Sequence, residues 1–504
     1  MEKHDAKRHE VLHHLEEEGS VSREAIRRVS EKTGVPEADV YGVARFYDLL
    51  VRPGARVCQG LSCLLAKGDL LGSLNNRHAV SCLGQCDRAP VSLDETLNLA
   101  ECGPRGAISP DNPKLPINLA GADSTNYEAL ALARKNGADW VIESLKSAGL
   151  QGRGGAGFPA HFKWNAVRNE SATPRYVICN ADEAEPGTFK DREVMLRRPH
   201  LILEGLAIAA ITIDSSEIYI YTRGEFQAAA SSIEAALLEA QTSLADFNFH
   251  LIRGHGAYIC GEETALIESI EGKRGMPRLK PPYPTQVGLF GKPTLMNNVE
   301  TLACVPGILK HGGQWFKDWK KTKTKTKLYC ISGHIANPGV YELPLGISLD
   351  ELVAAAGGYE GTPHAFSPGG ASSGFLPISE RGRALSFRSL PEVGSMLGSA
   401  GVVVLNDTVD MAWAVRWQTI FFEDETCGQC APCRIGVRMV RQAIDRYIET
   451  GDPESLAHLE GVAWEMDEGS ICGLGMTAAL PLISAIKHFP IEFGPRQAKI
   501  EGVS

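Results

Sequence analysis

The chain has 504 residues, of which 43% are hydrophobic and 22% charged, and this length predicts two to four domains rather than a single core. Its formal net charge of −10 argues against nucleic acid as the main partner, because a phosphate-binding surface needs an excess of cations. The N-terminus lacks an apolar signal region, and the apolar stretch at 205–213 is too short to span a membrane, so we expect a cytoplasmic protein. Thiols stay reduced there, and the 13 cysteines are expected to be metal ligands, nucleophiles or core residues.

Residues 1–50 are expected to be helical and to form a small bundle or docking piece. A polar first helix precedes a second helix near Ser22 to Thr33, and Pro36 is a favourable start for a third. One face of this third segment is apolar at helical spacing. That face consists of Val40, Val43, Tyr47 and Leu50.

The next segment, 51–110, alternates short apolar pieces with cysteine loops. Its thiols form a C-x4-C pair and a C-x3-C pair within less than thirty residues, which supplies enough thiolates for a 2Fe-2S cluster or for a zinc ion. The cluster is the favoured interpretation. The four cysteines are Cys58, Cys63, Cys82 and Cys86. A segment rich in Pro, Asn and Asp at 109–124 is typical of a linker.

Residues 125–320 mix strand and helix patterns and predict an α/β domain. Within it, Gly152, Gly154 and Gly157 show the spacing G-x-G-x-x-G. A helical pattern rather than a strand precedes this loop, and Pro159 interrupts the helix that should start on its last glycine, so the Rossmann arrangement is disfavoured. The loop is either merely flexible or an anion cradle of backbone N–H groups, with Arg153 and Lys163 adding charge.

Two further stretches of this domain carry chemistry. Asp182, Glu183 and Glu185 crowd the end of a predicted strand, where they bind ribose hydroxyls or a metal unless they form only a charged turn. The stretch 256–302 combines glycine, carboxylates, basic residues and two amides. Its Cys260 has no base beside it in sequence, so a buried core thiol is favoured over a nucleophile.

The last third of the chain divides into two parts. The run KKTKTKTK at 320–327 is expected to be a solvated loop, and 328–405 a small β-rich domain with one helix. Beyond it, 408–495 is expected to be a helical bundle, with helices at 408–422, 433–449, 452–467 and 476–488.

A second cysteine set lies in that bundle. Three cysteines in the spacing C-x2-C-x2-C suit three irons of a 4Fe-4S cluster, and a cysteine after 38 intervening residues can bind the fourth iron. Zinc and a purely structural role are the alternatives. This set is Cys427, Cys430, Cys433 and Cys472. Two iron–sulfur sites together with the glycine loop and the acidic strand end indicate one-electron transfer linked to a nucleotide-type cofactor. Iron–sulfur clusters carry single electrons, whereas a nicotinamide cofactor gives hydride, so a flavin is the natural converter between the two.

These strings together resemble a known family. From about 125 to 493 the chain resembles the NADH-binding flavoprotein subunit (51 kDa type) of respiratory complex I and of NAD-linked formate dehydrogenases and hydrogenases. GRGGAGFP, CNADEAEPGTFKDR, GAYICGEETAL and CGQCAPCR carry the resemblance. The N-terminal part, in GVPEADVYGVARFYDLL and CLGQCDRAPVSL, resembles the family's 24 kDa-type partner, which has a thioredoxin-like fold and a 2Fe-2S cluster.

The resemblance implies a multidomain α/β fold. Its parts are a helical segment (1–50), a thioredoxin-like 2Fe-2S module (51–110), an FMN/NADH-binding domain (125–320), a ubiquitin-like β-grasp domain of SLBB type (328–405) and a helical bundle with the 4Fe-4S cluster (408–495). It also implies that Glu185 is catalytic, and that NADH lies against Phe158, Glu185, Lys280 and Tyr283. The remaining residues fall at FMN positions: Gly152, Arg153, Gly154, Gly155, Lys163, Asn180, Asp182, Glu183, Tyr258, Gly261, Glu262, Glu263, Asn297 and Asn298.

The implied function is that of a diaphorase, which exchanges hydride between NAD(H) and FMN and single electrons with a partner subunit. The stretch 472–493 looks most like soluble formate dehydrogenase β subunits, so the expected partner is a large molybdenum or tungsten formate dehydrogenase subunit. A hydrogenase diaphorase comes next and complex I third. A different class, a relay or docking subunit without NADH oxidation, is the rival hypothesis.

Overall fold

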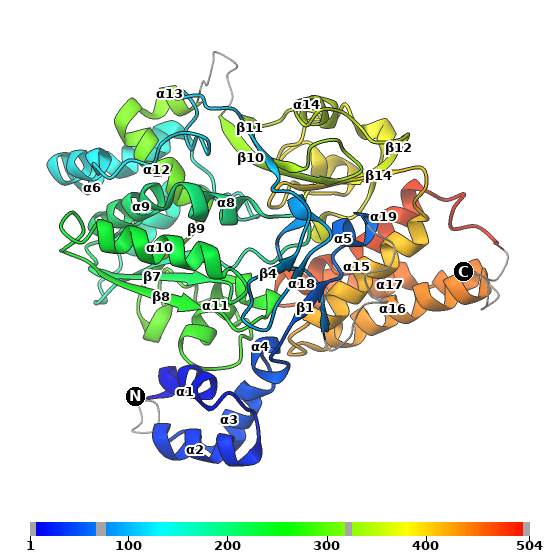
Figure 1. The fold of residues 1–504 in the computed structure, drawn as a ribbon, viewed down its shortest axis with the longest axis horizontal. Helices are drawn as coiled ribbons and strands as arrows, with labels where there is room; N and C mark the ends of the chain where they lie inside the picture. Colours follow the sequence, from blue (N-terminus) through cyan, green and yellow to red (C-terminus); the bar gives the residue numbers. More distant parts are fainter. Residues whose placement is uncertain (1–6, 67–76, 318–324, 497–504) are drawn as a thin grey trace.

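The structure is a computed structural model that describes residues 7–66, 77–317 and 325–496. Its helices α1 to α4 extend from one side, while the cysteine-rich segment with β1 and β4 lies between a large α/β part, a β-rich part and the C-terminal helices (Figure 1). The expected multidomain α/β fold class is confirmed.

The N-terminal helices follow the sequence pattern closely. The Ser22 hydroxyl accepts a hydrogen bond from the Ala25 N–H and so caps α2, which ends at Gly34 in the left-handed conformation. Pro36 immediately precedes α3, and the expected apolar face is buried at Val40, Val43 and Tyr47. The helices are α1 (Val11–Glu18), α2 (Arg23–Thr33), α3 (Glu37–Ala44) and α4 (Asp48–Val51).

The cysteine-rich segment forms a small mixed sheet of order β2-β1-β3-β4 with one short helix. Its elements are β1 (Arg56–Cys58), α5 (Leu61–Ala66), β2 (His78–Val80), β3 (Ser92–Leu93) and β4 (Leu99–Glu101). The following strand β5 (Ala107–Ile108) instead pairs in parallel with β11 of the β-rich part. A Cβ on Gly339 would lie 2.1 Å from the Ala107 carbonyl oxygen, so only glycine permits this approach.

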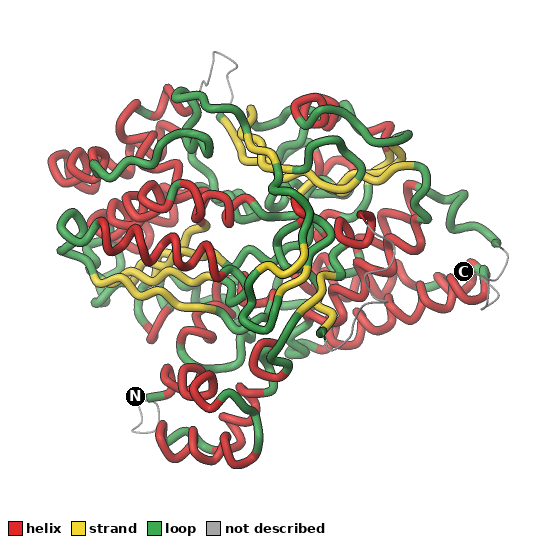
Figure 2. The backbone as a smooth tube through the Cα atoms, viewed as in Figure 1, coloured by secondary structure: helices red, strands yellow, loops and turns green. Residues whose placement is uncertain are grey.

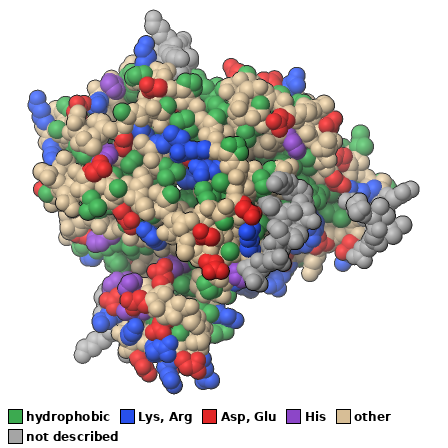
Figure 3. All heavy atoms as spheres, in the orientation of Figure 1, with side chains coloured by type: hydrophobic (Ala, Val, Ile, Leu, Met, Phe, Trp, Pro, Cys, Tyr) green, Lys and Arg blue, Asp and Glu red, His purple; other side chains and the backbone are tan. Residues whose placement is uncertain are grey.

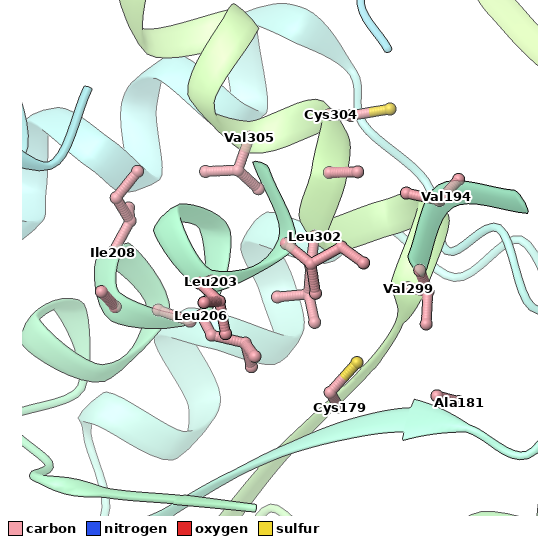
Figure 4. Packing of buried hydrophobic residues seen from close by; sticks show 14 of the residues in the cluster. Cys179, Ala181, Val194, Leu203, Leu206, Ile208, Val299, Leu302, Cys304 and Val305 are labelled. Atoms are coloured by element: carbon pink, nitrogen blue, oxygen red, sulfur yellow. The ribbon is translucent and has the colours of Figure 1, made fainter. Parts of the chain in front are cut away.

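The large α/β part contains a fully parallel sheet of order β8-β7-β6-β9, so the carboxyl ends of its strands share one edge. Helices α9 and α12 bury Leu203, Leu206, Leu302 and Val305 above Cys179 of β6 (Figure 4). The strands are β6 (Tyr176–Ala181), β7 (Glu217–Thr222), β8 (Asn248–Arg253) and β9 (Thr294–Asn298). The helices are α6 (Glu128–Ala148), α7 (Ala160–Arg168), α8 (Lys190–Arg197), α9 (Pro199–Thr212), α10 (Gln227–Glu239), α11 (Glu263–Ile270), α12 (Val299–His311) and α13 (Gly313–Lys317).

The β-rich part has the sheet order β13-β12-β14-β10-β11-β5 and one helix, α14 (Leu349–Ala355). Its own strands are β10 (Thr326–Gly333), β11 (Gly339–Pro344), β12 (Pro363–Ser367), β13 (Leu376–Pro377) and β14 (Gly401–Asn406). The expectation of a solvated loop at 320–327 is wrong for its end, because Thr326 and Lys327 are buried in β10. Residues 320–324 of that run lie outside the described residues.

The C-terminal part is helical (Figure 2). Two of the four expected helices are each divided. A 3-10 turn at Pro453–Leu456 is separated from α17 by His458, whose φ of 67° breaks the helix, and α18 is separated from α19. The bounds are α15 (Met411–Glu425), α16 (Ala431–Thr450), α17 (Leu459–Gly469), α18 (Gly473–Thr477) and α19 (Leu480–His488). Among the residues that the structure describes, no helix combines the length and apolarity that crossing a membrane requires.

Candidate functional site

A cavity of about 570 Å³ lies where the α/β part, the β-rich part and the C-terminal helices meet. The glycine loop, the end of β6 and the 3-10 helix Tyr258–Gly261 form its walls, together with loops of the β-rich part and α18. Many residues predicted from sequence line it. These are Gly154, Gly155, Asn180, Asp182, Glu183, Glu185, Tyr258, Gly261, Glu262 and Asn298.

The glycine loop does not have Rossmann geometry, as its sequence context predicted. It follows helix α6, and Pro159 precedes α7, so the last glycine does not start a helix. A Cβ on Gly154 would lie 3.1 Å from Asn298 Cβ, whereas glycine leaves the backbone close to the cavity. The backbone at Gly154 and Gly155 therefore lines the cavity directly, which allows the close approach that a phosphate or flavin requires.

The ends of the neighbouring parallel strands β6 and β9 supply amide side chains. Asn180 Nδ2 donates to the Gly261 carbonyl at 2.9 Å, which joins β6 to the 3-10 helix. Asn298 caps α12 through its Oδ1 and donates from Nδ2 to Asp191 Oδ2 at 2.6 Å. Asn297 accepts a hydrogen bond from Trp164 Nε1 at 2.8 Å and does not line the cavity. These bonds fix the strand ends that face the cavity.

Two adjacent carboxyl groups after β6 have different partners. Asp182 Oδ2 is buried with no hydrogen-bond partner among the described residues, and burial raises the pKa of this carboxyl to about 8. Glu183 accepts the N–H groups of Asp191 and Arg192 at 2.9 and 3.0 Å, so it caps α8, and burial raises its pKa to about 7. An unpaired buried oxygen beside a glycine cradle fits a polar ligand that supplies the missing hydrogen bond.

Glu185 is held in one orientation by three donors. Tyr258 Oη donates to its Oε2 at 2.5 Å, and the Ser372 N–H donates to its Oε1 at 2.8 Å. The Ser372 hydroxyl also donates to Oε2, at 3.2 Å. Burial raises the pKa of this carboxyl. A Cβ on Gly370 would lie 2.5 Å from Glu185 Cγ, so glycine is needed there.

A second group of charges lies beside the cavity. Lys163 Nζ binds Glu263 at 2.9 Å, and Lys280 Nζ binds Glu262 at 2.8 Å, while Glu262 also caps α11. More than half of the surface of Phe158 and of Tyr283 is exposed, as ring stacking on a nucleotide requires. Lys163, Glu263, Lys280, Phe158 and Tyr283 do not line the cavity itself, and neither does Gly152, whose N–H binds the Phe158 carbonyl. Their roles in binding remain predictions.

The structure does not bring the Arg153 guanidinium to the cavity. It is 1% exposed and lies 3.3 Å from Glu300 Oε1, and it also donates to the Thr326 carbonyl. Glu300 in turn binds Lys190 and Lys327. Although burial opposes ionisation, these cations hold the pKa of Glu300 down to about 2. The network ties α8, α12 and β10 together behind the glycine loop.

Sequence reasoning missed the walls contributed by the later domains. The signal that could have identified one of them is the glycine and serine run PGGASSG at 368–374, which contains Gly369 and Ser372. The others are Met396, Gly398, Ser399, Asp467, Gly473, Leu474, Met476 and Thr477. The prediction for Cys260 is confirmed: this residue is 1% exposed, as expected of a buried core thiol.

The four C-terminal cysteines converge next to this cavity. Cys427 and Cys430 precede α16, Cys433 lies in its first turn, and Cys472 precedes α18. Burial and the charges of the other three cysteines raise the pKa of the Cys433 thiol to about 12. A cluster replaces these protons with iron. Because Leu474 and Met476 of α18 line the cavity, the cysteine site and the cavity share one wall.

The four N-terminal cysteines are also close together, and all four are buried. A Cβ on Gly60 would lie 3.4 Å from Cys58 Sγ and 3.6 Å from Cys82 Sγ, and interactions with Cys63 and Cys82 raise the pKa of the Cys58 thiol. The Gly60 N–H points at Cys58 Sγ at 3.4 Å, and the Gly84 N–H at Cys82 Sγ at 3.3 Å. Backbone N–H groups aimed at sulfur stabilise thiolate ligands of an iron–sulfur cluster.

Known families and proteins match this arrangement. Four family models match in chain order: thioredoxin-like [2Fe-2S] ferredoxin (1–98), Nuo51 FMN-binding domain (145–307), SLBB domain (328–376) and NADH-ubiquinone oxidoreductase-F iron-sulfur binding region (413–496). A second F-type subunit of the NADH-quinone oxidoreductase of Rhizobium meliloti (strain 1021) is 46% identical over 406 residues, which cover 77% of this chain and 96% of that protein. The chain belongs to the family of F-type subunits of NADH-quinone oxidoreductases.

Two further matches extend this assignment. The F-type subunit of the NADH-quinone oxidoreductase of Rickettsia typhi (strain ATCC VR-144 / Wilmington) is 42% identical over 412 residues, covering 77% of this chain and 98% of the relative. A chain in the crystal structure of an NAD+-reducing [NiFe]-hydrogenase in the H2-reduced state matches with a TM-score of 0.88 and 29% identity, covering 98% of this chain and 94% of that chain. That structural match therefore includes the fused N-terminal module.

These matches decide between the alternatives left open by the cysteine spacing. Both cysteine sets fall in iron–sulfur domains, 2Fe-2S at the N-terminus and 4Fe-4S at the C-terminus, rather than in zinc sites. The glycine loop and the acidic strand end fall in the FMN-binding domain. FMN and both clusters are thus cofactors of this chain, and the family implies NADH binding.

Proposed function

We propose that the chain is a diaphorase subunit that exchanges hydride with NAD(H) at the cavity and delivers single electrons to a partner subunit. The observation that carries the proposal is the wall shared by the cavity and the Cys427, Cys430, Cys433 and Cys472 site. When bound, FMN takes up a hydride and releases its electrons one at a time. A relay without NADH oxidation has no need of the exposed aromatic and charged rim beside the cavity.

The chain's own residues bind and orient in this proposal. The glycine loop and the ends of β6 and β9 form the cradle, and the unpaired Asp182 Oδ2 is available to form a hydrogen bond with the flavin. Glu185, fixed by Tyr258 and Ser372, presents a carboxylate that can accept hydrogen bonds from the ribose or carboxamide of NADH. The buried Leu474 excludes water between the cradle and the cysteines.

For the partner, the finer proposal is a large formate dehydrogenase subunit that contains molybdenum or tungsten, in the cytoplasm. Its support is the resemblance of residues 472–493 to formate dehydrogenase β subunits and the fusion of both modules in one chain. The full-length structural match favours a hydrogenase as the second candidate. The family relatives, which cover 77% of this chain, make a complex I assembly the third.

Affinity purification from the native host tests this proposal. The chain should contain FMN that is released on denaturation, and it should reduce ferricyanide with NADH. Mass spectrometry should find a large molybdenum or tungsten subunit in the complex. A nickel–iron subunit in its place would contradict the formate proposal alone, whereas FAD, or no flavin, would contradict the diaphorase proposal.

A further inference from the structure

A second cavity, of about 380 Å³, lies between the N-terminal cysteine module and the α/β part and is separate from the FMN cavity. One side is the β3–β4 hairpin with Leu93, Leu97 and Leu99, and the other is formed by α8 and the start of α10. Lys and Arg side chains gather on the face in view of Figure 3 at the place where Figure 1 shows α8.

Arg88 is an inadequately neutralised cation in this cavity. Its side chain is 14% exposed, and its Nε is buried without a hydrogen-bond partner in the part of the chain that the structure describes. Asp87 lies 3.8 Å away but already binds Arg192 through both oxygens, at 2.9 and 2.8 Å. Burial and the charges of Arg192 and Arg105 lower the pKa of Arg88, consistent with a local excess of positive charge.

More arginines than carboxylates line the cavity. Arg105 and Arg197 share Glu193 with Arg192, and Arg223 neutralises Glu225, whose Oε2 also lies buried here. The lining itself contains three arginines, Arg88, Arg105 and Arg192, and one carboxylate, Glu225.

The N-terminus of α10 adds donors to the same cavity. This helix has 13 residues, and its N-cap residue, Phe226, has no side-chain group that caps the first turn. Gln227, Ala228 and Ala229 all line the cavity, and the first backbone bond of the helix comes from the Ala230 N–H. Unpaired N–H groups and the positive end of a helix dipole bind anions.

We propose that this cavity binds a small organic anion. Its phosphate or carboxylate group contacts Arg88, Arg105 and the N-terminus of α10, and its apolar body packs against Leu97, Leu99 and Phe226. The volume suits a ligand at the small end of the range for binding cavities. Arg192 also binds the Gly84 carbonyl and the Gln85 side chain, between Cys82 and Cys86, so the ligand lies next to a cluster loop.

Isothermal titration of the FMN-loaded full chain with phenyl phosphate tests the proposal. One saturable site is expected, whose affinity falls with added salt and is unchanged by saturating NADH. Inorganic phosphate should bind at least about tenfold more weakly, because it lacks the apolar body, and phenol should not bind. Benzoate in place of phenyl phosphate distinguishes a carboxylate site from a phosphate site.

Variants locate the site. Arg88→Met should weaken binding of phenyl phosphate at least about tenfold. Arg105→Met, at a side chain that is 47% exposed, should weaken it in the same direction and carries the test if the first variant fails to fold. Arg134→Met is the matched control, because Arg134 pairs with the exposed Asp246 and does not line this cavity, and should bind as the parent does. No saturable binding, or equal binding by the parent and both cavity variants, would overturn the proposal.

Discussion

Glu185 illustrates how a single side chain is prepared for binding. Three hydrogen bonds from Tyr258 and Ser372 hold its carboxylate at the cavity. If it contacts NADH, Glu185→Gln should raise KM for NADH about tenfold while the flavin content stays unchanged, because binding is lost rather than the cofactor. Steady-state kinetics and FMN extraction measure both, with Glu234→Gln at an exposed ion pair as control. Loss of FMN from Glu185→Gln would instead place Glu185 in the flavin site.

At Gly154 the decisive feature is the space that a side chain would occupy. Gly154→Ala would bring a Cβ to 3.1 Å from Asn298 Cβ, which displaces the cap of α12 and the cradle. The FMN content per chain should fall at least about fivefold, measured by fluorescence after denaturation. Gly461→Ala, where a Cβ meets nothing within 4 Å, should keep its FMN. Full FMN content in Gly154→Ala would show that the loop does not approach the flavin.

At the scale of elements, the buried network of Glu300 joins α8, α12 and β10. Glu300→Gln should lower the free energy of unfolding by about 3–5 kcal/mol, because it leaves the buried Lys190 and Lys327 without their shared carboxylate. Urea denaturation at pH 7 measures this loss. The conservative Glu239→Gln, at a largely exposed carboxylate, should cost under about 1 kcal/mol. Equal stability of Glu300→Gln and the parent would exclude a structural role for the network.

The same carboxylate predicts a pH dependence. Its pKa is about 2 in the folded chain against an ordinary 4.5, so its contribution to stability is fully present above about pH 4.5 and is lost as the pH falls from there towards 2. The stability difference between the parent and Glu300→Gln should therefore shrink over that window. A difference that is the same at pH 7 and at pH 3 would contradict this assignment.

Helices were predictable from sequence where caps and apolar spacing agree, as at Ser22 and Pro36. The burial of Lys327 was not predictable from sequence. It depends on an ion pair with Glu300, which lies 27 residues earlier and comes close to Lys327 only in the folded chain. The cavity shows the same division. Its glycines, strand-end carboxylates and amides could be predicted from the local sequence. Ser372, Met396 and Leu474 could not, because they line the cavity only through the packing of three domains against one another.

For the whole molecule, two separate clusters are expected. Iron analysis should give about six irons per chain, from a 2Fe-2S and a 4Fe-4S centre. Cys82→Ser should remove the slowly relaxing EPR signal of the reduced chain and leave the fast-relaxing one, because Cys82 lies among the N-terminal sulfurs only. Cys102→Ser, at an exposed thiol outside both sets, is the control and should keep both signals. Four irons and a single signal in the parent would leave the N-terminal module as a docking unit.

The most direct test of the diaphorase assignment is an anaerobic titration of the purified chain with NADH. The flavin absorbance should bleach, and both iron–sulfur EPR signals should grow as NADH is added, because the cavity and the cysteine sites belong to one electron-transfer unit. A chain that contains FMN and iron but shows neither bleaching nor reduced-cluster signals at excess NADH would contradict this account.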